Sequence, residues 1–270
     1  MEWILIFLVG ILAGTLGSLL GLGGGIIVVP ALLFLGTIEF MDISPQVAVG
    51  TSLLSIIATG MASTIAYVKK GLVDLKSGFI FFIGSGPGGI VGAYANGYLH
   101  TSSFSLYFGL FILFISFVIF IRDKLPPIKP SGIMFTYIDM DGRQHEYGYQ
   151  LVVALSISFV VGFLSGLFGI GGGALMVPVM LLFFRFPVHV AVATSMFMIL
   201  LSSITSSITH YYLGNIEWLL VILLVPGAWI GANLGSYINT KLMPQTIMWI
   251  LRIFLLVLGL RLIYEGILGY

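Results

Sequence analysis

The chain has 270 residues, of which 59% are hydrophobic and only 8% are charged, and its mean hydropathy is +1.15. Soluble domains carry roughly 25% charged residues because water must wet their surface, so this composition excludes a soluble fold. The net charge of +1 gives no indication of nucleic-acid binding. Without cysteine there is neither a disulfide nor a thiolate metal site.

Long apolar blocks follow one another along the chain, beginning at residues 3–20. Their length of about 20 residues is what a helix needs to cross a hydrocarbon core of roughly 30 Å, where the backbone must satisfy its own hydrogen bonds. A β-barrel would show alternating segments, whereas residues 106–121 do not alternate. We therefore predict an all-α integral membrane protein that crosses the cell membrane several times.

The first block could also be a secretory signal peptide, because it is apolar and starts the chain. It lacks a basic flank and an A-x-A cleavage site, and its glycine pattern recurs later in the sequence. We therefore interpret residues 3–20 as a membrane segment of the protein.

Each half of the chain is predicted to contain one glycine-interrupted segment and three spanning helices, which gives about eight long helices in all. The predicted spanning helices cover residues 45–68, 77–99 and 104–121, and then 187–212, 217–239 and 245–268. Past the glycines, residues 26–34 and 174–184 extend for only roughly 15 to 20 Å at the α-helical rise, which is too short to cross. We predict that they are re-entrant half-helices.

Three motifs occur twice, in the same order. A glycine-rich motif ending in V-P covers residues 14–30 and 162–178, A-V-x-T-S covers 48–52 and 191–195, and P-G-x-x-x-G-A covers 87–93 and 226–232. Glycine enrichment in membrane helices could produce one such match by chance, but three collinear matches indicate a duplicated chain. We predict a first membrane repeat at residues 1–122, a hydrophilic linker at 123–149 and a second membrane repeat at 150–270.

The linker contains an alternating run at residues 134–147 around Asp141-Gly142, a dipeptide that favours a type I′ β-hairpin. A small cytoplasmic hairpin is expected, either as a tether between the repeats or as a regulatory element.

The loop charges predict how the repeats are oriented, because Lys and Arg near helix ends favour the cytoplasm. The charged residues that decide this in the first half are Glu39, Asp42, Lys69, Lys70, Lys76, Arg122 and Lys124. The matching loops of the second half carry the opposite sign, through Arg185, Glu217 and Lys241. We predict inverted repeats, with both termini outside and the linker inside.

Two glycine breaks, Gly21–Gly25 and Gly169–Gly173, interrupt apolar segments at matching positions. The amides at the N-terminus of a half-helix can bind an anion, and glycine lets the ligand approach the backbone closely. Glycines also occur in membrane helices simply because they allow tight packing. Three consecutive glycines exceed what packing needs, so the predicted substrate-binding residues include Gly23, Gly24, Gly25, Gly171, Gly172 and Gly173.

Polar side chains near these breaks complete the predicted site. Thr51-Ser52 and Thr194-Ser195 place duplicated hydroxyls inside long helices, where they could donate to anion oxygens or bond the preceding backbone turn. Arg252 lies about eight residues into the last helix, and such an arginine either serves function or extends to the interface.

Enzymatic constellations are missing from the sequence. It has no H-E-x-x-H and no pair of membrane-embedded aspartates, and its triple glycines are not followed by the Lys and Ser or Thr of a phosphate loop. We therefore expect no catalysis, no cofactor and no bound metal.

The segments GLGGGIIVVP at residues 21–30 and GIGGGALMVP at 169–178, with the two T-S sites, resemble the sulfite exporter TauE/SafE family over almost the whole chain. The resemblance implies a membrane transporter for a small sulfur-containing anion such as sulfite or a sulfonate, with export as the expected direction. Lipid surrounds such a protein, and coupling to protons or sodium ions and a homo-oligomer are compatible with it. The alternatives are an anion channel and a membrane assembly or sensor subunit.

Overall fold

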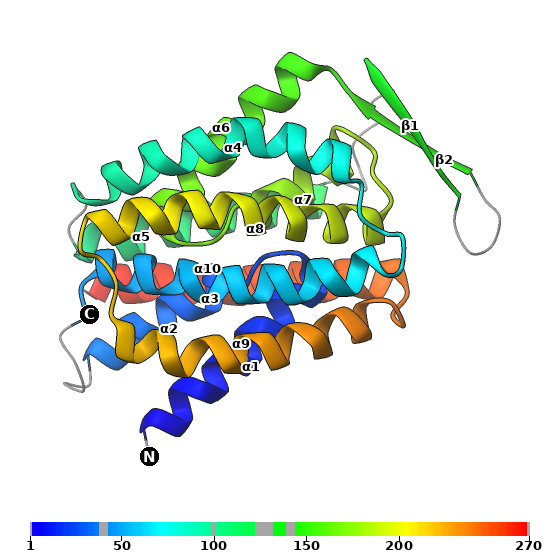
Figure 1. Ribbon diagram of the computed structural model, residues 1–270. Helices are drawn as coiled ribbons and strands as arrows, with labels where there is room; N and C mark the ends of the chain where they lie inside the picture. The colour runs from blue at the N-terminus through cyan, green and yellow to red at the C-terminus, as the bar shows by residue number, and fades with distance from the viewer. Residues whose placement is uncertain (1, 38–42, 99–100, 122–131, 139–143, 269–270) are drawn as a thin grey trace.

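The computed structural model describes residues 2–37, 43–98, 101–121, 132–138 and 144–268 (Figure 1). The first half contains α1 (Glu2–Leu20), α2 (Gly25–Thr37), α3 (Pro45–Val68), α4 (Leu75–Asn96) and α5 (Thr101–Ile121). A hairpin of β1 (Ile133–Ile138) and β2 (Gln144–Tyr149) follows. The second half contains α6 (Leu151–Phe168), α7 (Gly173–Leu182), α8 (Val188–Tyr212), α9 (Trp218–Asn239) and α10 (Pro244–Leu268).

The predicted all-α membrane fold is confirmed. Within the described residues, seven helices are long and apolar enough to cross a bilayer. The predicted spanning helices fall within a few residues of α3, α4, α5, α8, α9 and α10. By contrast, α2 has 13 residues and α7 has 10, so the segments after the glycines are short helices, as expected.

Side-chain caps and prolines explain where several helices begin. The Ser44 side chain accepts a hydrogen bond from the Val47 amide, and Pro45 occupies the first turn of α3. The Asp74 carboxylate accepts from the Ser77 amide at the start of α4, and Glu217 accepts from Leu219 at the start of α9. These groups satisfy amides that a helix cannot satisfy internally.

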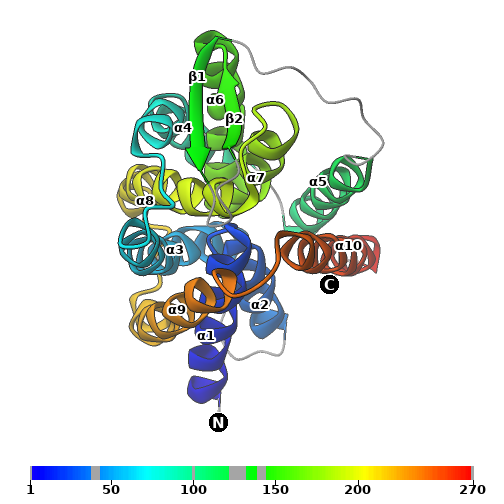
Figure 2. The ribbon, with the colours of Figure 1, turned by 90° about the vertical axis from the view of Figure 1, so that its right-hand side faces the viewer.

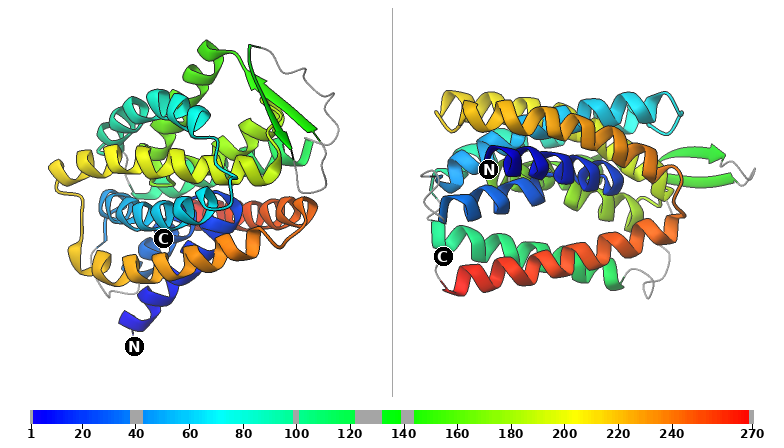
Figure 3. Two further views of the ribbon diagram at one scale, coloured as in Figure 1. Left: turned by 45° about the vertical axis from the view of Figure 1, so that its right-hand side comes forward. Right: turned by 90° about the horizontal axis from the view of Figure 1, so that it is seen from below.

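The most extensive helix contacts each join one helix of the first half to one helix of the second half. The helix α1 packs on α9 and α4 packs on α6, while α3 packs on α8 and α5 on α10. Figures 2 and 3 show the α5–α10 pair set to one side of the other helices. Each pairing is matched by the pairing of the equivalent helices in the other half.

Glycines let these backbones approach closely, and they correct one of the motif alignments. A Cβ on Gly88 would clash with the Phe159 carbonyl, and a Cβ on Gly231 would clash with that of Ile11, the equivalent of Phe159. Gly88 therefore corresponds to Gly231, whereas the recurrence of P-G-x-x-x-G-A pairs it with Gly227. The two occurrences of this motif are displaced by one helical turn, because glycine contacts recur every turn along both helices.

Equivalent helices run in opposite directions. The Asp74 amide donates to Thr194 Oγ1 (3.0 Å), so the start of α8 lies beside the start of α4 and the end of α3. In the same way the Glu217 amide donates to Thr51 Oγ1 (3.1 Å), so α9 starts beside the start of α3. Figure 1 shows α3 and α8 crossing the molecule antiparallel. That the repeats are inverted across a bilayer stays a prediction.

The α6–α7 segment enters and leaves on one side of the molecule. The Gly148 amide, just before α6, donates to the Phe184 carbonyl, just after α7 (3.0 Å). In Figure 1 the α1–α2 segment likewise returns toward the side where the N-terminus lies, opposite the hairpin. Both arrangements fit re-entrant helix pairs.

The predicted β-hairpin is present, although its Asp141-Gly142 turn lies outside the described residues. Tyr147 Oη donates to Asp74 Oδ2 (3.1 Å) and Tyr149 Oη donates to Ser77 Oγ (2.8 Å). Burial raises the pKa of Tyr149 to about 12, and burial together with Asp74 raises the pKa of Tyr147 further, so both phenols are protonated donors at neutral pH. The hairpin is therefore fixed to the start of α4.

The described basic loop residues gather on the hairpin side. Lys69 follows α3, Arg185 follows α7 and Lys241 follows α9, whereas Glu217 lies at the opposite end. This distribution agrees with a cytoplasmic hairpin. The other charges used to predict orientation, Glu39, Asp42, Arg122 and Lys124, lie outside the described residues.

Inversion across the bilayer can be tested by labelling, since the chain has no cysteine. Lys69 and Tyr212 are equivalent, as are Tyr98 and Lys241, and all four are exposed. We expect Lys69→Cys and Lys241→Cys to react with an impermeant maleimide only from the cytoplasm, and Tyr98→Cys and Tyr212→Cys only from outside. The cysteine-free parent is the control. Reaction of Lys69→Cys and Tyr212→Cys from the same side would overturn the inverted arrangement.

Candidate functional site

The two glycine breaks adopt the same backbone conformation. Gly23 and Gly24 have φ angles of +81° and +94°, and the equivalent Gly171 and Gly172 have +71° and +73°. A side chain at these positions would be strained, because L-residues disfavour the left-handed region. The glycines are therefore needed to reverse the chain, whether or not a ligand approaches them.

The breaks touch each other. A Cβ on Gly25 would clash with the Gly169 carbonyl oxygen and would lie 2.9 Å from the Cα of Ile170. Both breaks also contact Ile56 and Ile199, which lie near the middle of α3 and α8, roughly 17 Å from the helix ends. The structure thus brings the predicted glycines together midway along the crossing helices.

Several carbonyl groups at and just after the end of α1 have donors. The Gly17 carbonyl accepts from the Leu22 amide (2.8 Å). The Leu19 carbonyl accepts from Asn239 Nδ2 (2.6 Å), and the Gly21 carbonyl accepts from Ser195 Oγ (3.0 Å).

The end of α6 has an equivalent set of donors. The Ser165 carbonyl accepts from the Gly169 amide (2.8 Å). The Leu167 carbonyl accepts from Asn96 Nδ2 (2.8 Å), and the Gly169 carbonyl accepts from Ser52 Oγ (2.9 Å). Because the carbonyl ends are satisfied, their negative partial charge is reduced on the side of each break where a helix ends.

The amide ends of α2 and α7 begin with N–H groups that make no intrahelical hydrogen bond. The Gly24 carbonyl accepts from the Ile27 and Val28 amides (2.9 and 3.1 Å), so intrahelical bonding starts only after Gly25 and Ile26. In α7 it starts with Met176, which donates to the Gly172 carbonyl (3.1 Å). The first amides of a helix have no intrahelical acceptor and carry positive partial charge. Two such ends at one place can attract an anion without a buried basic side chain.

The predicted hydroxyls are all engaged with the protein. Ser52 and Ser195 bridge α3 and α8 to the opposite repeat's break, and each also donates to a carbonyl of its own helix. Thr51 and Thr194 accept amide hydrogens at the starts of α9 and α4, away from the breaks. Direct contact of these hydroxyls with a substrate stays a prediction.

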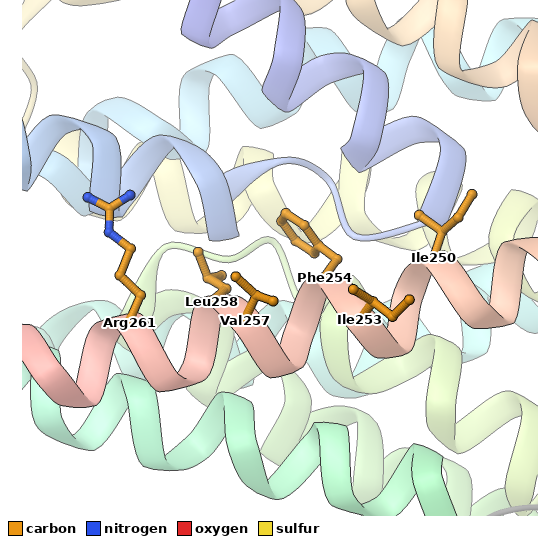
Figure 4. A pocket seen from close by; sticks show the side chains of 6 residues that line it. All are labelled: Ile250, Ile253, Phe254, Val257, Leu258 and Arg261. Atoms are coloured by element: carbon orange, nitrogen blue, oxygen red, sulfur yellow. The ribbon is translucent and has the colours of Figure 1, made fainter.

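Arg252 is not brought to the glycine breaks. Its guanidinium lies over the rings of Phe120 (5.7 Å) and Trp249 (5.5 Å), between α10 and α5. A separate groove, with a volume of about 480 Å³, lies along the α10 face turned toward α1 and α2 (Figure 4). Its lining residues are Ile250, Ile253, Phe254, Val257, Leu258 and Arg261. Arg252 lies about 200° around the helix from Ile250 and from Phe254, so its role as an anion ligand stays a prediction.

Comparison with known proteins agrees with this architecture. The sequence profile of the family described as sulfite exporter TauE/SafE matches residues 6–262. The chain belongs to the TauE/SafE family. The probable membrane transporter protein YunE of Bacillus subtilis is 53% identical over 271 residues, which cover 99% of both chains. A probable membrane transporter protein of Methanocaldococcus jannaschii is 29% identical, over 95% of this chain and 93% of the relative. No solved structure matches the chain.

Membership of a transporter family makes the protein a membrane transporter, and it directs attention to residues that the sequence analysis missed. Asn96 and Asn239 occupy equivalent places at the ends of α4 and α9, and Ile56 and Ile199 are equivalent on α3 and α8. Extending the A-V-x-T-S alignment along the helices could have found both pairs. Their contacts with the breaks are visible only in the structure.

A substitution at Gly23 tests whether the space between the breaks serves transport. Its added Cβ would lie 3.1 Å from the Cγ2 atoms of both Ile56 and Ile199. Gly214 is a matched control, because its φ of +75° resembles the +81° of Gly23 but a Cβ there meets nothing within 4 Å. We expect backbone strain to cost Gly23→Ala and Gly214→Ala a similar amount of stability, about 1–2 kcal/mol.

Only Gly23→Ala should lose transport. We expect a loss of roughly ten- to hundredfold, the effect of about 1.5–3 kcal/mol for a hydrogen bond to a charged group. Thermal unfolding and uptake into proteoliposomes provide the two measurements. Equal transport by both variants would count against a substrate path between the breaks.

Proposed function

We propose that this membrane transporter is a secondary carrier that exports a small sulfur-containing anion, such as sulfite or a sulfonate, by alternating access around the two glycine breaks. The observation that carries the proposal is the contact of Gly25, the first residue of α2, with Gly169 and Ile170 of the other break, midway along α3 and α8. Several carbonyls at the neighbouring helix ends already have donors. This arrangement leaves amide hydrogens as the polar groups available to a ligand. An oxyanion with several acceptor oxygens suits them.

The family description supports the choice of substrate, since it names sulfite and export. Sulfite and small sulfonates are compact anions whose oxygens could accept hydrogen bonds from both α2 and α7. Neutral amides would bind such an anion without the strong charge pairing that hinders release. The low charge content of the whole chain fits this use of backbone groups.

The antiparallel arrangement of equivalent helices supports alternating access. If each repeat can adopt the conformation of the other, the protein has two related states that open the same central site toward opposite faces. In this mechanism α3 and α8 carry the two breaks past each other.

The decisive experiment is a substrate panel with the purified full chain in proteoliposomes. Labelled sulfite, sulfoacetate, sulfate and chloride are compared, each with and without a proton or sodium gradient. We expect saturable uptake of sulfite or sulfoacetate that accelerates when unlabelled anion is present on the opposite side. Gly214→Ala should behave like the wild type, and Gly23→Ala should take up the anion roughly ten- to hundredfold more slowly.

The same panel separates the alternatives. Passive anion conductance without acceleration by unlabelled anion would indicate a channel. Movement of none of the sulfur anions would overturn the proposed substrate class. Export is tested in cells preloaded with labelled sulfite, where expression of the wild-type protein should speed loss of label; unchanged retention would contradict the direction.

A further inference from the structure

Two isoleucine side chains occupy the space between the glycine breaks. A Cβ on Gly23 would lie 3.1 Å from Cγ2 of both Ile56 and Ile199. A Cβ on Gly171 would lie 2.9 Å from Cγ2 of Ile56 and 3.0 Å from that of Ile199. Each isoleucine therefore contacts both breaks, although one comes from α3 and the other from α8.

The pair is equivalent in the two repeats and fully buried. Ile56 and Ile199 both have an exposed fraction of 0%. Ile56 Cδ1 also lies 2.7 Å from a Cβ position on Gly25, the first residue of α2. Methyl groups thus stand beside the amide end that we assign to the anion.

An anion cannot reach that amide end while the methyls stay in place. To pass them it would have to give up its hydrating water next to apolar groups that offer no hydrogen bonds in return, which costs too much free energy. We infer that Ile56 and Ile199 form an isoleucine gate, which closes the anion site between the breaks and limits the size of the anion that enters. This inference rests on the proposed function. It adds the two residues that block the path and determine its width.

The equivalence of the two residues gives the gate a mechanical role. As α3 and α8 move relative to each other, both methyl sets move with them, since each isoleucine lies near the middle of its helix. Opening toward either face therefore requires the same separation of Ile56 from Ile199. Shortening either side chain should widen the passage in both directions.

Closure can be measured without any substrate, by the reaction of a cysteine beside the breaks. Ile170 is suitable, because it has an exposed fraction of 0% and its Cα lies 2.9 Å from a Cβ position on Gly25. The probe is sulfonatoethyl methanethiosulfonate, a small thiol reagent that carries a sulfonate. In purified protein we expect Ile170→Cys to react at least tenfold faster when Ile56→Ala and Ile199→Ala are both present, and denatured protein gives the full extent of reaction.

Matched variants separate the gate from general loosening. Leu53 also has an exposed fraction of 0% and lies one turn before Ile56 on α3, so Leu53→Ala makes a comparable cavity and should leave the reaction slow. Ile56→Val and Ile199→Val keep the Cγ2 methyls and remove only Cδ1, so they should give an intermediate rate and should fold if the alanine pair does not. Three results would overturn the gate. They are fast reaction of Ile170→Cys with both isoleucines intact, equal acceleration by Leu53→Ala, and no acceleration by the alanine or valine pairs.

Transport selectivity gives the second readout. We expect Ile56→Ala with Ile199→Ala to raise uptake of the larger sulfoacetate relative to sulfite by roughly tenfold, the lower end of what one methylene changes in an apolar pocket. An unchanged ratio in a protein that still transports sulfite would contradict size control by the gate. If neither anion moves but labelling still depends on the isoleucines, the proposed function fails and the closure stands.

Discussion

The contact between the two glycine breaks is the constraint on which the rest of the structure depends. Gly25 approaches the Gly169 carbonyl so closely that no side chain fits between them. Ser52 and Ser195 then tie each break to the long helix of the opposite repeat. Since these hydrogen bonds are made inside an apolar protein, the hydroxyl groups would be costly to bury without them. The two repeats are therefore held together at their centres.

Around this contact the carbonyl ends and the amide ends of the helices differ in their hydrogen bonding. Asn96 and Asn239, with the two serines, donate to the carbonyls where α6 and α1 end. The first amides of α2 and α7 lie at the opposite, positive ends of their helices. The positive end of α2 therefore lies beside the contact, with the Cδ1 methyl of Ile56 next to it, where we propose that Ile56 and Ile199 close the site. In the proposed mechanism, the short helices α2 and α7 supply the amides that bind the anion. The long helices α3 and α8 supply the apolar side chains that close the site.

The two halves of the chain use the same residue types at equivalent positions. Several interactions occur once in each half: the Thr51–Glu217 bond has its counterpart in Thr194–Asp74, and the Ser52–Gly169 bond in Ser195–Gly21. The β-hairpin breaks this equivalence, because it lies only between the repeats and binds the start of α4. A role of the hairpin as a tether or as a regulatory element stays a prediction.

The sequence by itself determined the membrane class, the helix spans and the recurrence of the motifs, because hydrophobic length and motif order are local properties of the chain. It also located both glycine breaks. Only the tertiary structure decided what the polar residues do: Ser52 and Ser195 bond the opposite break, Thr51 and Thr194 bond distant helix starts, and Arg252 lies between α5 and α10. It likewise identified Ile56 and Ile199, which look like ordinary apolar residues of spanning helices. Such roles depend on partners more than a hundred residues away, which composition and spacing do not specify.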